Sequence, residues 1–384
     1  MSGPGRPLLF YAAWPLGYHN IEAERKAVSL AEDGYDVVYM TGIGTRNPRL
    51  SRLPKLVDRV GRKLSGGAAG VPAAVPGLRT AALAVVPPRQ LGVVRCMNER
   101  WLERQLRATI GDWGQAVAWV RWPTQELVAA LRQLRPELVV YESVDANHLS
   151  PGIIGTRWHQ IFEEAERALV SLADVVVVPG EALAERYRAW GAAVTILPHG
   201  VDLGAWRQER EPVQAPTLGF IGTLDYRLDM AAIQHIATAR PDWSLRLIGP
   251  VQEGFHPQAL SAFRNVSVEA AVPPSEVAAL NLGFDVGLLA YRDHPHYTFM
   301  APLKALELLG AGTPVVARWN PALAELGGLV RFASTSADYV AQVEAATDED
   351  SPALARARRA EAERHSWDHT LDAMRQLLAG QLET

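Results

Sequence analysis

A lysine and a glutamate three residues apart, Lys304 and Glu307, have the side chains and spacing that nucleotide binding would use. Pro302 suits the first turn of a helix, and helical residues at i and i+3 share one face. The unpaired N–H groups of such a helix start attract phosphate, Lys304 adds a mobile positive charge, and Glu307 could accept hydrogen bonds from a ribose diol. An ordinary surface ion pair would have the same spacing, so the pair alone does not decide between the two interpretations.

The segment around this pair resembles the ribose-binding signature of GT-B glycosyltransferases, close to family 4 and its polysaccharide-building relatives. The signature P-x-K-x-x-E-x-x-A-x-G-x-P-V-V is matched, with Gly310 in place of Ala, by Pro302, Lys304, Glu307, Gly312, Pro314, Val315 and Val316. Other elements agree in order and spacing over nearly the whole chain: 198–202 (PHGVD), 218–222 (LGFIG), 242–250 (DWSLRLIGP) and 365–368 (HSWD). The resemblance implies transfer of a sugar from a nucleotide diphosphate sugar to a hydroxyl or amine acceptor.

The resemblance also implies a donor site in the second half of the chain. Its residues would be Gly222, Thr223, Arg227, Tyr291, Arg292, Pro302, Leu303, Lys304 and Glu307. Phe299 stands where many family-4 members have a glutamate beside the transferred sugar. Arg227 is the only cation in the loop 222–227, where an Arg and a Lys are usual. These departures leave the donor sugar and the stereochemistry open.

No metal and no other cofactor is expected. Fixed positive groups at the leaving diphosphate would do the work that a metal does in other folds. The acidic stretch 348–350 lies in a turn-like region before a charged helix, which favours a solvated surface.

Two residues of the first half are candidate bases. His19 resembles in position the base histidine of inverting family-1 enzymes, and a neutral imidazole there could take the proton of the acceptor hydroxyl. Asp145 follows the apolar run 138–141 and could orient His19, or be the base itself as in some glucuronosyltransferases of this architecture. Each could instead be an ordinary polar residue. Further candidates on the acceptor side are Gly17 and His199, with Glu142 and His148 less favoured.

Short apolar runs alternate with amphipathic stretches throughout the chain, which predicts parallel sheets wrapped by crossover helices. The predicted strands are 8–13, 36–40, 138–141, 175–178 and 194–197, then 217–221, 244–248, 266–268, 286–289, 314–317 and 329–332; helical patterns include 21–31 and 160–172. The expected fold is α/β, with two tandem doubly wound, Rossmann-like domains in the GT-B architecture. The expected bounds are 1–202 for the acceptor domain, 203–216 for the linker, 217–365 for the nucleotide-sugar domain, and 366–384 for a helix that returns to the first domain.

Composition excludes several other classes of protein. The 384 residues are 48% hydrophobic, enough for two cores. A net charge of −4 argues against a nucleic-acid partner, and a single cysteine, Cys96, excludes intramolecular disulfides and favours a cytoplasmic location. The apolar run 8–14 is too short for a signal peptide, and no stretch is long enough to predict a membrane-spanning helix.

Residues 46–66 hold seven Lys and Arg against the single Asp58, with apolar residues at helical spacing. Such a basic amphipathic helix could lie on the inner face of a membrane or face an anionic acceptor, unless its apolar stripe packs on its own domain. The acceptor could be a small molecule, a glycan or a lipid-linked compound. Four tryptophans, Trp101, Trp113, Trp119 and Trp122, could line an apolar acceptor pocket or be core.

Two other functions remain open. One is a nucleotide-sugar 2-epimerase of the same fold, which Phe299 disfavours because epimerisation needs carboxylates and histidines around the sugar. The other is a non-catalytic protein that binds a nucleotide sugar. A near match to the dinucleotide fingerprint at 42–47 fails because its third glycine is Asn47.

Overall fold

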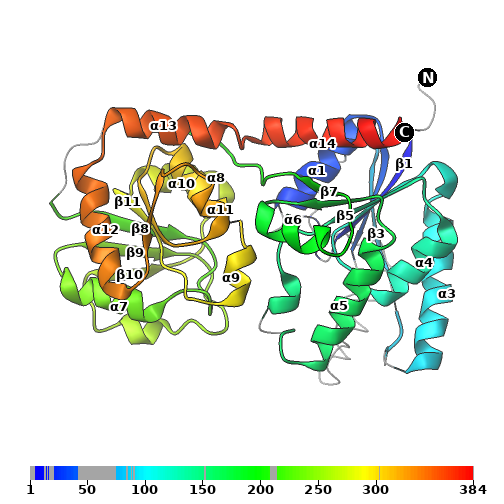
Figure 1. Cartoon of the computed structure of the whole chain (residues 1–384), viewed down its shortest axis with the longest axis horizontal. Helices are drawn as coiled ribbons and strands as arrows, with labels where there is room; N and C mark the ends of the chain where they lie inside the picture. The colour runs from blue at the N-terminus through cyan, green and yellow to red at the C-terminus, as the bar shows by residue number, and fades with distance from the viewer. Residues whose placement is uncertain are drawn as a thin grey trace. The chain divides into compact units, whose positions relative to one another are not determined.

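The computed structural model describes residues 5–383 apart from 13, 15, 17–20, 42–74, 84, 88, 90, 151–152, 208–213 and 302. The chain forms two compact units, each built on its own parallel sheet with helices around it (Figure 1). The first unit contains residues 1–179, 183–197 and 373–384, and the second contains 180–182 and 198–372. The predicted α/β fold with two doubly wound domains is confirmed.

The first unit has a seven-stranded sheet in the order β3-β2-β1-β4-β5-β6-β7. Its strands are β1 (Pro7–Ala12), β2 (Asp36–Thr41), β3 (Leu78–Ala82), β4 (Val117–Val120), β5 (Leu138–Glu142), β6 (Val175–Val178) and β7 (Val194–Ile196). Its helices include α1 (Ile21–Glu32), α3 (Gly92–Thr109), α4 (Gln125–Leu134), α5 (Arg157–Val170) and α6 (Glu181–Arg188). Strands β3 and β4 were not predicted. β3 is a partly exposed edge strand without an apolar run, and β4 is a fully buried strand of four residues.

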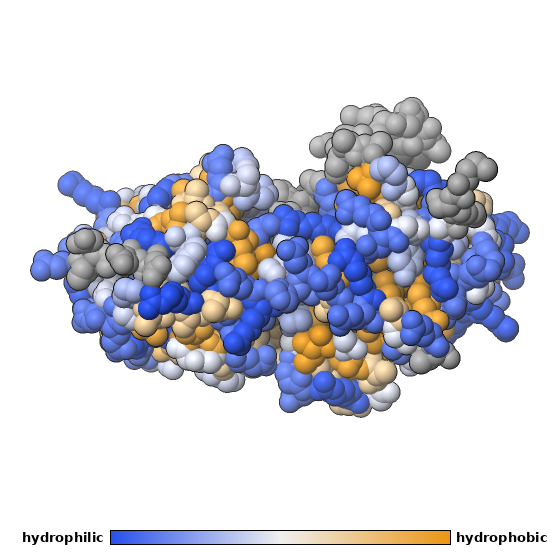
Figure 2. Space-filling view, turned by 90° about the horizontal axis from the view of Figure 1, so that it is seen from above, coloured by the Kyte–Doolittle hydropathy of each residue, from blue (hydrophilic) through white to orange (hydrophobic). Residues whose placement is uncertain are grey.

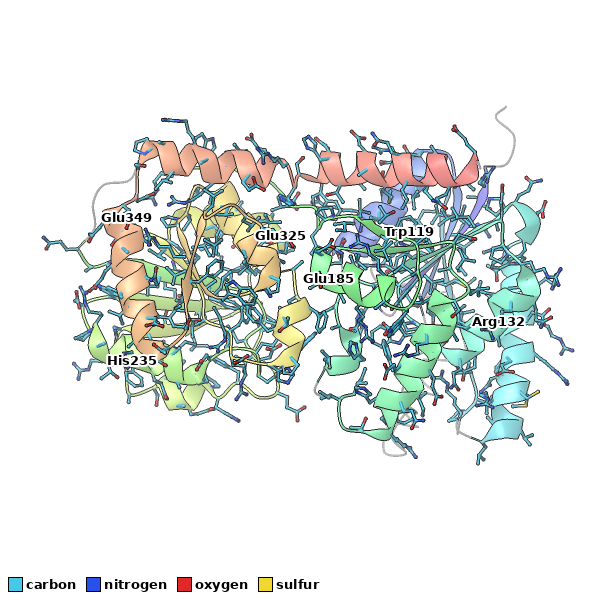
Figure 3. All side chains as sticks on the ribbon, in the orientation of Figure 1. Trp119, Arg132, Glu185, His235, Glu325 and Glu349 are labelled. Carbon is cyan, nitrogen blue, oxygen red and sulfur yellow. The ribbon has the colours of Figure 1, made fainter. Side chains whose placement is uncertain are left out.

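Aromatic rings fill the centre of the first core. Trp119 of β4 is fully buried and stacks 6.1 Å from Phe10 of β1, which in turn stacks 5.5 Å from Tyr39 of β2 (Figure 3). Trp113 is buried as well, whereas Trp101 is 40% exposed on α3. Trp113 and Trp119 are therefore core residues and cannot line an open acceptor pocket.

A cluster of charged side chains is also buried in this unit. The carboxylate of Glu142, at the end of β5, accepts hydrogen bonds from Lys26 Nζ at 2.6 Å and Trp119 Nε1 at 2.6 Å, and lies 3.0 Å from Arg121 Nε. Burial opposes the charge on Lys26, but the carboxylates of Glu142 and Glu22 outweigh it and raise the lysine pKa. Because its oxygens bind these cations, Glu142 has a structural role in the core.

The second unit has a six-stranded sheet in the order β10-β9-β8-β11-β12-β13. Its strands are β8 (Thr217–Ile221), β9 (Ser244–Ile248), β10 (Val266–Glu269), β11 (Val286–Leu289), β12 (Val315–Arg318) and β13 (Val330–Ala333). Its helices are α7 (Met230–Ala239), α8 (Pro274–Leu282), α9 (Pro295–Phe299), α10 (Leu303–Gly310), α11 (Pro321–Ala324), α12 (Ser336–Asp348) and α13 (Pro352–Glu363), followed by the start of α14 (Trp367–Leu382). All six strands predicted for this half are present within one residue at either end.

The segments before and after the second sheet have defined contacts. Leu203 packs against the second core and the Arg207 N–H donates to the Ala311 carbonyl at 3.1 Å, so 203–207 pack within the second unit. Helix α14 begins at Trp367, in the HSWD segment, and its residues from 373 onward belong to the first unit. There, Arg375 binds Asp33 and Ser29, each at 2.8 Å.

Candidate functional site

The candidate donor residues lie on loops and on helix α10 at one edge of the second sheet. Strands β11 and β12 are parallel neighbours joined through α10, so α10 begins at the edge where β11 ends. The loop that begins at Gly222 follows β8 at the same edge, because β8 is parallel to β11. Ligands of open α/β sheets bind at this carboxyl edge. The predicted helix is confirmed over residues 303–310, while Pro302 lies outside the described residues.

Lys304 and Glu307 contact each other across one turn of α10. Lys304 Nζ lies 3.1 Å from Glu307 Oε2 and 3.4 Å from Oε1, and the side chains are 31% and 20% exposed. A partly exposed i,i+3 pair contributes only a few tenths of a kcal/mol, about 0.2–0.5. A ligand that offered a phosphate to the ammonium and hydroxyls to the carboxylate could therefore replace this pair at little cost.

The ammonium arm of Lys304 lies over the glycine loop. A Cβ placed on Gly222 would come within 3.3 Å of Lys304 Cε, and one placed on Gly249 would lie 1.9 Å from the Gly222 carbonyl oxygen. Gly249 has a φ of +148°, outside the range that other residues readily adopt. The strand ends at 222 and 249 thus approach as closely as only glycine permits, and Thr223 follows half-buried.

Arg227 is held in place by Asp225 of the same loop. Arg227 Nε donates to both carboxylate oxygens, at 2.9 and 3.1 Å, Nη2 donates to Oδ2 at 2.8 Å, and the Arg227 N–H donates to Oδ1 at 3.0 Å. Burial acts to lower the pKa of Arg227, but the hydrogen bonds and charge of Asp225 outweigh it and raise the pKa. Arg227 is therefore a fixed cation, 28% exposed at its side chain.

Tyr291 and Arg292 connect this loop to the end of β11. Burial raises the pKa of Tyr291 to about 12; the charge of Arg227 opposes the shift, and Asp225 and Glu307 add to it. The Arg292 N–H donates to the Arg227 carbonyl at 2.8 Å, and its guanidinium is exposed. The structure therefore brings together most of the predicted donor residues: Gly222, Arg227, Tyr291, Arg292, Lys304 and Glu307. Leu303 is the half-buried first residue of α10.

Three supporting residues were not identified from the sequence. Asp225 fixes Arg227. Its position two residues before the arginine, in the same loop, could have indicated this ion pair from the sequence. His296 is buried, with Nδ1 3.0 Å from the Tyr226 hydroxyl. Asn320 Nδ2 donates to the carbonyls of Tyr297 and Met300, at 2.5 and 3.2 Å, which fixes the chain just before α10. The contacts of His296 and Asn320 depend on tertiary structure and had no local signal.

Only some of the residues predicted for the acceptor side belong to the part of the chain that the structure describes. His19 and Gly17 lie outside the described residues. Asp145 is half-buried past the end of β5, and its Oδ1 accepts the Ala146 N–H at 2.8 Å. His148 is buried with its ring 5.9 Å from that of His159, and His199 is half-buried in the second unit.

The first unit contains a pocket of about 190 Å³ between α3, α4 and α5, at the carboxyl end of β4. Its lining includes Trp158, Gln125, Glu164 and Arg95. One wall is the ion pair of Arg89 with the buried Glu126, at 2.5 Å. An aromatic ring beside amide, carboxylate and guanidinium groups suits a ligand with apolar faces and several hydroxyls.

Two searches of the described residues gave negative results. No group of three or more His, Cys, Asp or Glu side chains in this part of the chain is arranged to hold a metal ion. Within the same residues, no helix has the length and apolar character needed to cross a membrane.

Comparison with known proteins agrees with this geometry. Residues 230–378, which include α10, match the glycosyl transferase-like family. A 111-residue stretch is 32% identical to TuaH of Bacillus subtilis (strain 168), named as a putative teichuronic acid biosynthesis glycosyltransferase; it spans 28% of this chain and 28% of TuaH.

Two solved structures resemble the chain over almost its full length. Anabaena Alr3699/HepE in complex with UDP-glucose has a TM-score of 0.62 and 14% identity, with 97% of this chain and 99% of that one covered. A glycosyltransferase from Rickettsia africae ESF-5 has a TM-score of 0.67 and 9% identity, with 99% of each chain covered. The fold is that of the GT-B glycosyltransferases. The GT-B fold predicted from the sequence is thereby confirmed. The match to the glycosyl transferase-like family covers residues 230–372 of the second unit and residues 373–378 of the first.

Proposed function

We propose that this chain transfers a sugar, of hexosyl type, from a nucleotide diphosphate sugar to a hydroxyl or amine acceptor. The observation that carries the proposal is the contact of Lys304 with both Glu307 and the glycine loop at Gly222, at the carboxyl edge of the second sheet. This arrangement places a mobile cation between a carboxylate and an open stretch of backbone. The family match over 230–378 and the UDP-glucose bound by HepE support the same assignment.

Each residue of the proposed donor site has a distinct role. Glu307 would accept hydrogen bonds from the ribose hydroxyls, and Lys304 and the start of α10 would bind the diphosphate. Arg227, oriented by Asp225, and the exposed Arg292 would add positive charge. These fixed cations would stabilise the negative charge that develops on the leaving diphosphate, and we propose that transfer needs no metal.

The acceptor is proposed to bind in the first unit. The name of TuaH supports a cell-envelope glycan, and the 190 Å³ pocket beside Trp158 offers groups that suit a sugar ring. Asp145 and His19 remain the proposed bases for an inverting reaction. The basic segment 46–66 is proposed to meet an anionic acceptor or a membrane surface at the cytoplasmic face.

Thermal-shift measurements on the full chain test the donor site. A panel of nucleotides and nucleotide sugars, UDP-glucose included, should contain a compound that raises the melting temperature. K304A and E307A should lose this shift and most transfer activity. R364A is the matched control, because Arg364 and Glu361 form an i,i+3 pair of similar length, 3.0 Å, at the end of α13. If no compound on the panel binds, or if K304A and E307A bind as the wild type does, the proposal fails.

Transfer that persists in excess EDTA would support the absence of a metal.

A further inference from the structure

Helix α3 presents an apolar surface that the proposed function does not use. Of the ten large hydrophobic side chains exposed among the described residues, five lie between positions 86 and 101. Val93 is 86% exposed, Leu91 54%, Met97 48% and Trp101 40%. In Figure 1, α3 lies on the outside of the first unit, packed against α4. In the view of Figure 2, the surface is mainly hydrophilic and apolar areas interrupt it. A group of exposed apolar side chains on one helix is typical of a surface that binds a partner or a membrane.

Three of these residues share one side of the helix, and the fourth lies just before it. Val93, Met97 and Trp101 are four apart, and Leu91 is the residue just before α3. The opposite side is buried through Leu102 and Leu106. We name Leu91, Val93, Met97 and Trp101 the α3 apolar face.

The loop before α3 is fixed to the helix by one side chain of α3. The side chain of the buried Asn98 accepts the Val86 N–H and donates to the Val86 carbonyl, both at 2.8 Å. The loop before α3 is therefore tied to the helix, and the α3 apolar face is held outward on a fixed support.

Arginines before and after Trp101 continue the same side of the helix. Arg100, Arg104 and Arg107 are exposed, and within the described part of the chain Arg100 and Arg104 form no ion pair. The two acidic residues of α3 form ion pairs within the helix. Glu99 Oε1 lies 3.7 Å from Arg95 Nε, and Glu103 Oε1 lies 2.9 Å from Arg107 Nη2. One side of α3 is thus apolar at its beginning and positive further on.

We propose that the α3 apolar face docks on an anionic lipid bilayer. Valine, leucine, methionine and tryptophan side chains would enter the boundary between headgroups and acyl chains, where tryptophan is favoured. Arg100 and Arg104 would bind the anionic headgroups. A second copy of this chain fits less well, because two identical faces would bring like charges into one interface. This surface is separate from the donor site and does not depend on the proposed function.

Vesicle sedimentation of the full chain tests the proposal. Vesicles of phosphatidylcholine with phosphatidylglycerol should bind the protein, and vesicles of phosphatidylcholine alone should bind it much less. V93E/M97E should lower the partition coefficient on the order of tenfold, because the apolar contact is lost. R100E/R104E should lower it by roughly thirtyfold or more, since two basic residues near an anionic surface are removed.

The matched controls are V251E, at a valine 48% exposed in the second unit, and R132E, at an exposed arginine of α4 labelled in Figure 3. Both should bind vesicles as the wild type does. All four variants change exposed positions, and unchanged midpoints of urea unfolding would show that both units are intact. The proposal is overturned if the wild type does not bind anionic vesicles, or if V93E/M97E binds them equally well. It is also overturned if V93E/M97E instead dissociates a dimer seen by sedimentation equilibrium.

Discussion

Asp225 holds the guanidinium of Arg227 through both of its carboxylate oxygens, with a shortest separation of 2.8 Å. The acid is buried and the base is partly exposed, so the pair turns a flexible side chain into a fixed positive group. The same carboxylate accepts the Arg227 N–H, which ties the turn of the loop to the direction of the arginine. Preorganised charge of this kind is what stabilisation of a leaving diphosphate requires.

Replacement of Asp225 by alanine should therefore destabilise the second unit. The change leaves a mostly buried guanidinium without its carboxylate, and a lost charged hydrogen bond of this type costs about 2 kcal/mol in the free energy of unfolding. D242A is the control, since Asp242 contacts Arg240 at the same sequence spacing but is exposed. Urea unfolding of both variants measures the difference. Equal midpoints for D225A and D242A would contradict the structural role of Asp225.

Substitutions at Lys304 and Glu307 should have different effects on the binding of a nucleoside and of its diphosphate. In the proposed site the lysine contacts phosphate and the glutamate contacts ribose. K304A should thus weaken the diphosphate by about tenfold or more, the value of one charged hydrogen bond, and leave the nucleoside unchanged. E307A should weaken both ligands. Calorimetric titration of both variants measures this, and equal losses for the two ligands in K304A would refute the assignment of its role.

Gly249 should tolerate no side chain. A Cβ there would lie 1.9 Å from the Gly222 carbonyl oxygen on a backbone with a φ of +148°. We expect G249A to lower stability by about 1–3 kcal/mol and to weaken nucleotide binding by displacing the glycine loop. G380A is the opposite case: nothing lies within 4 Å of its Cβ position in α14, and alanine favours helix, so stability should rise by up to about 1 kcal/mol. A stable G249A protein with wild-type affinity would show that the loop can adjust.

Features of the fold and of the candidate site could be predicted from the sequence when the residues involved are close together in the chain. The run Val175–Val178 predicted its strand, and the spacing of Lys304 and Glu307 predicted their contact, because both are local patterns. That Gly222 lies close to Lys304 could be predicted only from the resemblance to GT-B glycosyltransferases, since the two residues are far apart in the chain. The contacts of Asn320 followed from neither source, because packing alone sets them.

Alkaline pH should destabilise the first unit through Tyr39. Burial raises the pKa of Tyr39 to about 12, with Arg121 opposing and Glu24 and Glu142 adding to the shift, while in the unfolded chain the value is near 10. The folded state then holds this proton more tightly, so its contribution is complete below pH 10 and is lost as the pH rises to 12. Y39F has no such proton and also loses the hydrogen bond to the Trp14 carbonyl, at 2.9 Å, worth about 1 kcal/mol.

The difference between wild type and Y39F should accordingly be constant from pH 7 to 9 and change by about 2 kcal/mol between pH 10 and 12, with the wild type losing more. The buried Lys26, whose pKa is also raised above its ordinary 10.5, begins to lose its contribution above about pH 10.5 in both proteins, so this loss cancels in the comparison. Urea unfolding at each pH, followed by the fluorescence of core tryptophans such as Trp119, measures the two curves. Parallel curves up to pH 12 would mean that the Tyr39 hydroxyl reaches water in the folded protein and ionises as it does in the unfolded chain.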